Sequence, residues 1–387
     1  MKRLVLLSLI VGISTMLTNC TEDSLTTPDL QGTAAEDLHP AIGPDALNIS
    51  YHSVLRGIQG GPEFSKKQVV GSFSGPLFGL AVAPNNDLVV ADAGAGVVTK
   101  DGILEISAPG ASSVSPIGRG SMWVVAGAGE DPFADTGQAL YRGTKGNVTL
   151  VANLFEFEAA NDPDEGEAPE SNPFDVVSLG GNAALVADAA GNDLLRIDNR
   201  GNVEILAVFP DELVSTANLK ALAGCPDSGH PFCTFDDMMP AQPVPTSIAI
   251  GPDGSYYVGE LKGFPAPTNE SNIWRVSPGA SLADCGNSPD CVKVFDGGFT
   301  SIIDLTFGAD GMLYVAELDE ASWFALEGAP AQSVGGTVNA CDVATLQCTV
   351  IASGIPMLTS VVEDANGTLW VTRNALIPSD AEVVQIP

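Results

Sequence analysis

Residues 245–260 read PTSIAIGPDGSYYVGE and contain two short apolar runs separated by a turn signal. The first run includes Ile248 and Ile250, and alternation of this kind is typical of a strand. Pro252-Asp253-Gly254 has the composition of a tight turn, and a second apolar run follows it at Tyr256 to Val258. Apolar runs on both sides of such a turn predict a β-hairpin.

The same pattern recurs along the chain. Related stretches occupy residues 76–92, 174–188, 300–317 and 358–373, with a weaker copy at 121–127. Segments that begin with glycine follow the first three hairpins, and we predict a third strand in each, at residues 102–106, 146–151 and 201–208. Hairpins repeated in this way build blades of four strands around an axis. Six copies therefore predict an all-β fold, a six-bladed β-propeller.

The last copy ends after about three strands, and an exposed sheet edge would remain unless the ring is closed. Residues 67–73, KQVVGSF, alternate apolar and polar side chains ahead of the first blade. We predict that this N-terminal strand closes the ring as the outer strand of the last blade, within a propeller domain that spans residues 66–387. Helical periodicity is weak throughout, and residues 211–222 are the best helix candidate.

The N-terminal residues 1–20 combine two cations, an apolar run and a terminal Cys20. This pattern is typical of a bacterial export signal and is too short for a stable membrane span. Its ending resembles a lipoprotein signal, in which Cys20 is lipidated; a simple signal peptide cut elsewhere is the alternative. Residues 21–65 are predicted to be a tether. We expect an exported lipoprotein at the outer membrane and cell surface, or in the periplasm.

The chain of 387 residues has 16 Lys and Arg against 48 Asp and Glu, a formal net charge of −32. Nucleic acids and anionic membrane surfaces would repel such a protein, so the charge argues against both as direct partners. We expect contact with a membrane only through the lipid on Cys20. The expected partner is an unidentified ligand or protein at the propeller face.

Six cysteines besides Cys20 fall into three couples that are close in sequence: Cys225 and Cys233, Cys285 and Cys291, Cys341 and Cys348. Each couple lies in a short stretch rich in Gly, Pro or Asp, so local pairing into three disulfides is the simplest arrangement. Zinc sites usually separate paired cysteines by two to four residues and add histidine, a pattern that these couples lack. Disulfides agree with export.

Several motifs resemble, in order, those of the ScyD/ScyE family. They are Asn161-Asp162-Pro163-Asp164 with Ser171-Asn172-Pro173, the stretch from Val186 to Leu195 (VADAAGNDLL), Pro245-Thr246-Ser247, Tyr257 to Leu261 with Gly263-Phe264-Pro265, and Ile302-Ile303-Asp304. The resemblance covers about residues 76–386. It implies an exported propeller similar to NHL-repeat proteins, and the founding members are linked to assembly of the sunscreen scytonemin.

Carboxylates recur at the end of the second strand of the hairpins, at Asp92, Asp188, Glu260 and Glu317. Equivalent positions in a propeller form a ring, and with Asn172 and Asn192 such a ring would suit Ca²⁺ or Mg²⁺, which prefer oxygen ligands. Gluconolactonase-like propellers hold a metal with similar residues. The alternative is that each carboxylate binds backbone amides of its own blade.

The acidic segment with Asp162, Asp164, Glu165, Glu167 and Glu170 lacks the start of a helix-loop calcium motif, so we predict a solvated loop, with Ca²⁺ binding as the alternative. No G-x-S-x-G, Walker A or G-x-G-x-x-G string occurs. Two functions remain. The first is a surface-tethered binding or assembly protein without turnover. The second is a metal-dependent lactonase or hydrolase, which requires several of the predicted ligands to meet at one point.

Overall fold

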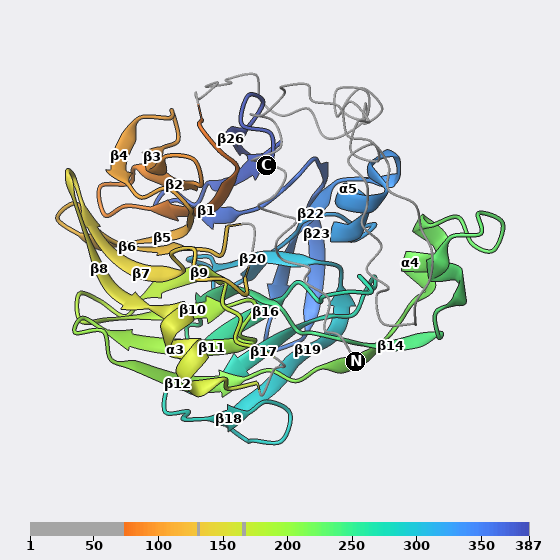
Figure 1. Cartoon of the computed structure of the whole chain (residues 1–387). Coiled ribbons are helices and arrows are strands. Elements are labelled where there is room, and N and C mark those ends of the chain that lie inside the picture. The colour runs from red at the N-terminus through yellow and green to blue at the C-terminus, as the bar shows by residue number, and fades with distance from the viewer. Residues whose placement is uncertain (1–72, 130–131, 165–167, 387) are drawn as a thin grey trace, which may run out of the picture.

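The structure, a computed structural model, describes residues 73–129, 132–164 and 168–386. Within these residues six sheets of three to five strands follow one another along the chain (Figure 1), and a seventh sheet is a two-stranded hairpin. The first strand of each of the six sheets contacts the first strand of the next, and the last sheet contacts the first. The all-β, six-bladed propeller predicted from the repeat is therefore confirmed.

The six blades use their strands in chain order, from the axis outward. Blade one has β1 (Leu77–Val82), β2 (Leu88–Asp92), β3 (Gly96–Thr99) and β4 (Leu104–Ser107). Blade two has β5 (Ala111–Gly118), β6 (Ser121–Ala126), β7 (Ala139–Thr144) and β8 (Asn147–Asn153). Blade three has β9 (Pro173–Ser178), β10 (Ala183–Asp188), β11 (Asp193–Asp198) and β12 (Val203–Val208).

The other three blades follow the same plan with longer connections. Blade four has β15 (Pro245–Ile250), β16 (Tyr256–Glu260), β17 (Ser271–Val276) and β19 (Cys291–Phe299). Blade five has β20 (Ile302–Phe307), β21 (Leu313–Glu317), β22 (Gly336–Asp342) and β23 (Gln347–Ile355). Blade six has β24 (Val361–Glu363), β25 (Leu369–Arg373) and β26 (Glu382–Gln385), three strands in the described part of the chain.

The stretch 245–260 forms the hairpin of β15 and β16. Ile250 pairs with Tyr256, and the turn between them places Gly254 at φ 80°, where a side chain would be strained. The Asp253 carboxylate accepts a hydrogen bond from the Ser255 amide at 3.0 Å. The turn chemistry therefore sets the register that buries Ile248 and Val258 against blade three.

One prediction about the blades was wrong in its numbering. The segments that begin with Gly102, Gly146 and Gly201 form β4, β8 and β12, which are fourth strands and not third strands. The third strands β3, β7 and β11 lie between them and the second strands. Each of these blades thus contains one short strand that the sequence pattern did not distinguish from its neighbours.

Direct bonds between blades one and six close the ring. The Leu77 amide donates to the Ala375 carbonyl at 2.8 Å, and the Thr359 hydroxyl donates to the Leu77 carbonyl at 2.8 Å. Phe73 packs with residues of both blades, including Val383 of β26. Of the predicted closing strand 67–73, all but Phe73 lie outside the described residues, as do the leader, the tether and Cys20.

Two insertions carry most of the structure outside the blades. The first forms α3 (Leu154–Asn161), which the sequence analysis did not predict. The second was predicted to be helical over residues 211–222, but its first half is the strand β13 (Glu212–Ser215), paired with β14 (Met238–Ala241). Only α4 (Ala217–Leu222) is helical there, followed by the 3₁₀ turn η2 (Pro231–Thr234).

Blade five adds α5 (Trp323–Gly328) and the 3₁₀ turn η3 (Pro330–Gln332). The loop between β17 and β19 contains β18 (Ala283–Asp284), which reaches back and pairs in parallel with β12 of blade three. No helix in the described residues is long and apolar enough to cross a membrane. The predicted disulfides are confirmed: Cys225–Cys233, Cys285–Cys291 and Cys341–Cys348.

Candidate functional site

The repeated carboxylates serve different purposes in different blades. In blade one, Asp92 accepts hydrogen bonds from the amides of Ser74, Gly94 and Ala95 at 2.7–3.2 Å. In blade three, Asp188 accepts bonds from three backbone amides and from the Ser171 hydroxyl at 2.6 Å. These two side chains hold the turns of their own blades, which is the alternative that the sequence left open.

Glu260 in blade four belongs to a buried ion pair. One of its oxygens accepts from the Trp274 indole at 2.5 Å, and the other lies 2.8 Å from the ammonium of Lys262. Lys262 is fully buried and also contacts Glu212 of β13 at 2.8 Å. Although burial raises the pKa of the Glu212 carboxyl, the charge and hydrogen bond of Lys262 lower it to about 2.

Glu317 in blade five accepts hydrogen bonds from the Thr300 amide and from the Asn339 side chain. Burial and the nearby charge of Glu320 raise the pKa of Glu317 to about 8. Asn172 is also committed, because its side-chain oxygen accepts from the Ala128 amide at 2.8 Å. Each of the predicted ligands Asp92, Glu260, Glu317 and Asn172 therefore contacts its own partners.

A different group of carboxylates meets beside blade three. Glu158 of α3, Asp162 and Asp164 each place one oxygen within 4.8 Å of the other two, the only such group among the described residues. Asn192 joins them, because its amide donates to Asp164 at 2.9 Å. Of the six predicted metal ligands, Asp188 and Asn192 lie at this cluster. Glu158 and Asp193, which also lie there, were not among the predicted ligands.

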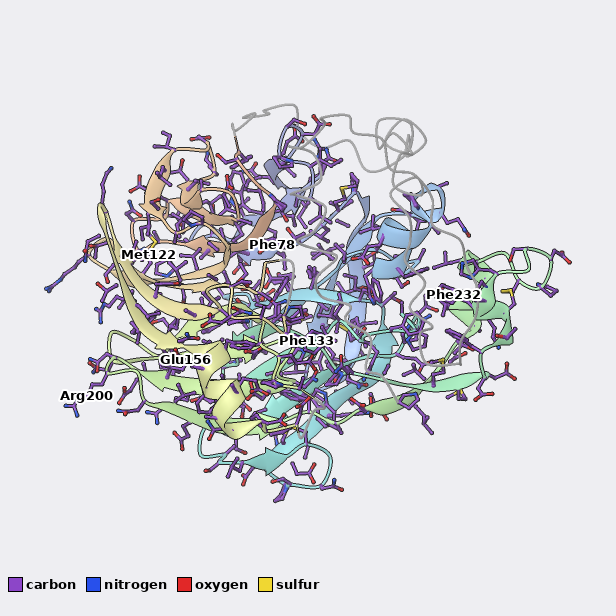
Figure 2. The ribbon with its side chains drawn as sticks, viewed as in Figure 1. Phe78, Met122, Phe133, Glu156, Arg200 and Phe232 are labelled. Atoms are coloured by element: carbon purple, nitrogen blue, oxygen red, sulfur yellow. A yellow bond between two sulfur atoms is a disulfide. The ribbon has the colours of Figure 1, made fainter. Side chains whose placement is uncertain are left out.

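The helix α3 positions Glu158. Asn153 precedes the helix and its side chain accepts from the Glu156 amide at 3.1 Å, as an N-cap does. Glu156 is exposed on this helix (Figure 2), whereas Glu158 is buried. An Asn followed three residues later by Glu is the sequence signal that could have identified the helix start.

Electrostatics at the cluster are unfavourable. Burial, and then the charges of Asp188 and Asp164, raise the pKa of Glu158 to about 9. Asp193, the first residue of β11, is fully buried, and its pKa lies well above the ordinary value because of burial and the charges of Asp188 and Glu158. No ion pair with a described lysine or arginine involves Glu158, Asp188 or Asp193.

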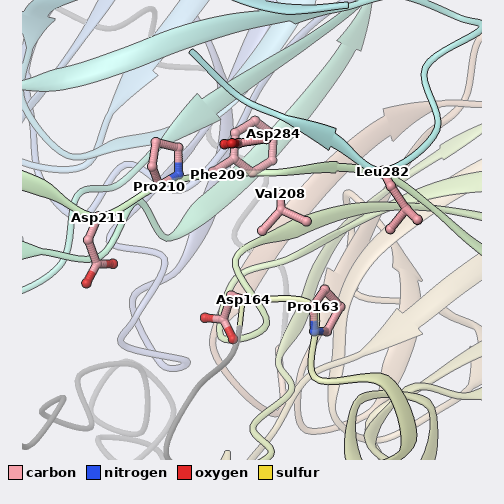
Figure 3. Close-up of a pocket in the computed structure, with 8 residues that line it drawn as sticks. All are labelled: Pro163, Asp164, Val208, Phe209, Pro210, Asp211, Leu282 and Asp284. Atoms are coloured by element: carbon pink, nitrogen blue, oxygen red, sulfur yellow. The ribbon is translucent and has the colours of Figure 1, made fainter. Parts of the chain in front are cut away.

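A cleft of about 360 Å³ opens beside the cluster (Figure 3). Three segments supply its walls: the end of the first insertion, the end of β12, and the loop that carries β18. The lining residues are Pro163, Asp164, Val208, Phe209, Pro210, Asp211, Leu282 and Asp284. Carboxylates and apolar side chains therefore share one cleft at the seam between blades three and four.

The first strands of all six blades also surround a cavity of about 350 Å³ on the axis. Asp175 of β9 and Asp304 of β20 line it, and each accepts a hydroxyl bond and backbone amide bonds, Asp175 from Ser113 and Ile248. Burial and the charge of Asp175 raise the pKa of Asp304 to about 8. This pair is distinct from the cluster beside α3.

The fold and these sites define a six-bladed β-propeller with a carboxylate cluster and an acidic cleft on one side of blade three. No protein-family model matches the chain, and no curated protein matches it. Among solved structures, the chain is similar to virginiamycin B lyase from Staphylococcus aureus, with 14% identity, 80% of each chain covered and a TM-score of 0.43.

It is also similar to a protein from Thermus thermophilus described as an oxidoreductase (glucose dehydrogenase), with 16% identity, 83% of this chain and 99% of that chain covered, and a TM-score of 0.49. A gluconolactonase from Xanthomonas campestris has 12% identity, with 85% and 96% covered and a TM-score of 0.46. Likeness at this level carries no argument about the chemistry of this chain.

Proposed function

We propose that this chain is an exported, lipid-anchored β-propeller that acts as an extracytoplasmic binding or assembly protein without turnover, in line with its resemblance to the ScyD/ScyE family. Three disulfides support export, because such bonds persist in oxidising compartments. The leader and Cys20 provide the anchor. Anchoring is tested by Cys20→Ala, which should release the protein from the membrane fraction.

The cleft between blades three and four carries the binding proposal. Part of its lining is apolar, with Val208, Phe209 and Leu282, and Leu282 is 68% exposed. Leu282 also has φ 49°, a conformation that few leucines adopt. Three aspartates line the same cleft. Apolar and acidic side chains in one cleft suit a ligand that combines an apolar or aromatic body with a positive charge.

The lactonase alternative has less support from the geometry. It requires predicted ligands such as Glu260 and Glu317 to share one metal, but Glu260 pairs with Lys262 and Glu317 bonds to Asn339. A lactone-hydrolysis assay with Ca²⁺ decides between the two. Turnover above the buffer rate that requires Ca²⁺ and is lost in chelator would replace the binding proposal with the enzyme.

A dye pair tests the cleft directly. Thioflavin T is aromatic and cationic, whereas anilinonaphthalene sulfonate is aromatic and anionic. We expect saturable binding of the cationic dye, at least tenfold tighter than that of the anionic dye, and weaker binding after Leu282→Ala. Leu346→Ala is the matched control, since Leu346 is 52% exposed at φ 59° away from the cleft. Equal affinity for both dyes, unchanged by Leu282→Ala, would contradict the proposal.

A further inference from the structure

The end of α3 brings three acidic side chains to one point. The helix terminates at Asp162, whose backbone is left-handed at φ 38° and whose amide donates to the Glu158 carbonyl at 2.8 Å. This turn ends the helix and leaves Asp162 and Asp164 close to Glu158. One oxygen from each lies within 4.8 Å of the others. Two Ca²⁺–oxygen bonds of about 2.4 Å span that separation.

A second observation is independent of that grouping. Asp193 is 0% exposed, and neither of its carboxylate oxygens has a hydrogen-bond partner among the residues that the structure describes. Glu158, 2% exposed, likewise has one buried oxygen without a described partner. A buried carboxylate without a donor destabilises a fold strongly unless something neutralises it. Asp188, which neighbours both, is fully bonded to its own turn.

Gly191, two residues before Asp193, lies close to two of these carboxylates. A Cβ atom at Gly191 would lie 3.3 Å from the Glu158 carboxylate and 3.3 Å from the Asp188 carboxyl carbon. Asn192 is left-handed at φ 53°, and its side chain donates to Asp164. This geometry turns the chain so that Asp193 starts β11 facing the same charges as Glu158. A side chain at residue 191 would therefore crowd these carboxylates.

We propose that Glu158, Asp162 and Asp164 bind one Ca²⁺ ion between α3 and the start of β11, and that the ion offsets the charge of the buried Asp193 nearby. The donors are all oxygens, without histidine or thiolate, which favours a hard cation over zinc or copper. The spacing of the oxygens suits Ca²⁺ better than Mg²⁺, whose bonds of about 2.1 Å require a tighter set. The calcium site shares Asp164 with the cleft, but the two proposals are tested separately, because calcium titration and dye binding can each fail alone.

Metal binding is measured on the whole mature protein after exhaustive dialysis against chelator. Calorimetric titration with CaCl₂ at neutral pH should show one site per chain, and Mg²⁺ at the same concentration should bind at least tenfold more weakly. The melting temperature with Ca²⁺ at about 100 times its dissociation constant should rise by roughly 3 °C for a chain of this size. Absence of stoichiometric binding at millimolar Ca²⁺ would overturn the proposal.

The variant Asp193→Asn separates a carboxylate whose charge a bound cation offsets from one that the fold itself needs. Loss of a buried charge that has no described partner should leave the Ca²⁺-free protein as stable or more stable, while calcium affinity falls at least tenfold. Asp92→Asn is the control, because Asp92 bonds to turn amides in blade one; it should lower the melting temperature equally with and without Ca²⁺. Unchanged calcium affinity in Asp193→Asn would contradict the site.

Glu158→Gln provides the second variant and is decisive if Asp193→Asn does not fold. It should also lower calcium affinity at least tenfold without loss of the folded state in chelator. Gly191→Ala adds a backbone test, since its methyl group would press on the Glu158 carboxylate. It should weaken calcium binding more than it changes the melting temperature in chelator. Full affinity in Glu158→Gln would overturn the assignment.

Discussion

Blades three and four bury carboxylates at matching places but treat the charge differently. In blade four, Glu260 lies against the buried ammonium of Lys262, and Asn272 near the start of β17 donates to Glu260 at 2.7 Å. In blade three, the start of β11 has Asp193 where blade four has an amide, and no described lysine or arginine pairs with it. One blade contains its own cation, and the other has space for an external one.

The difference shows that the propeller framework does not dictate the chemistry at the strand ends. Lys262 reaches Glu260 from the loop after β16, and Glu212 reaches Lys262 from the hairpin β13–β14. Glu158 reaches blade three from a helix inserted after blade two. In both cases an insertion decides which charge faces the strand ends, whereas the hairpins below it are alike.

Removal of the built-in cation should have the largest effect. Lys262→Met leaves Glu260 buried without a positive charge, and breaking such a pair costs about 3–5 kcal/mol. The free energy of unfolding from urea titration measures the loss. Lys293→Met is the control, because Lys293 is partly exposed and also pairs with Glu212, so it should cost about 1 kcal/mol or less. Equal losses of unfolding free energy in the two variants would mean that the burial of Lys262 does not determine its contribution to stability.

Without Ca²⁺, neutralising one buried carboxylate should change the free energy of unfolding in opposite directions in the two blades. Glu260→Gln removes the partner of a buried lysine and should destabilise the protein by about 3 kcal/mol. Asp193→Asn removes a buried charge without a described donor and should stabilise it, by about 1–2 kcal/mol. Urea titrations of both variants without Ca²⁺ make the comparison. Destabilisation by both would show that Asp193 also has a structural counter-charge.

The axial carboxylates give an effect on stability that depends on pH. Burial and the charge of Asp175 raise the pKa of Asp304 to about 8, above the ordinary 3.8. The folded state therefore holds an extra proton between about pH 4 and pH 8, and this contribution to stability is lost as pH rises through that window. One pKa unit corresponds to about 1.4 kcal/mol.

We therefore expect a higher melting temperature at about pH 5 than at about pH 8, and a smaller difference in Asp304→Asn. Asp290→Asn on the exposed loop near β18 is the control for the general effect of net charge, and should keep the wild-type difference. Glu212 cannot produce the same trend, since its pKa is lowered to about 2 and its contribution is lost only in acid. An unchanged pH dependence in Asp304→Asn would exclude the axial pair as its source.

The sequence predicted the blades because each hairpin is local: Ile250 and Tyr256 are close in the chain and meet across their own turn. It predicted the disulfides for the same reason. The sites could not be predicted in this way. Lys262 and Glu212 are 50 residues apart, and Asp193 meets Glu158 only because α3 folds back on blade three. Equivalence of repeat positions suggested one ring of ligands, but the insertions gave each blade different partners.

The smallest expected effect concerns the helix that delivers Glu158. Asn153→Ala removes the side chain that accepts from the Glu156 amide, and loss of an N-cap costs about 1 kcal/mol. Because this helix carries Glu158, one of the proposed calcium ligands, calcium affinity should fall severalfold. Calorimetric titration measures it, with Asn147→Ala on the exposed start of β8 as control. The ion pair of blade four does not involve this helix. The loss of unfolding free energy caused by Lys262→Met should therefore be the same with and without Asn153→Ala. A different loss would mean that the two blades are coupled.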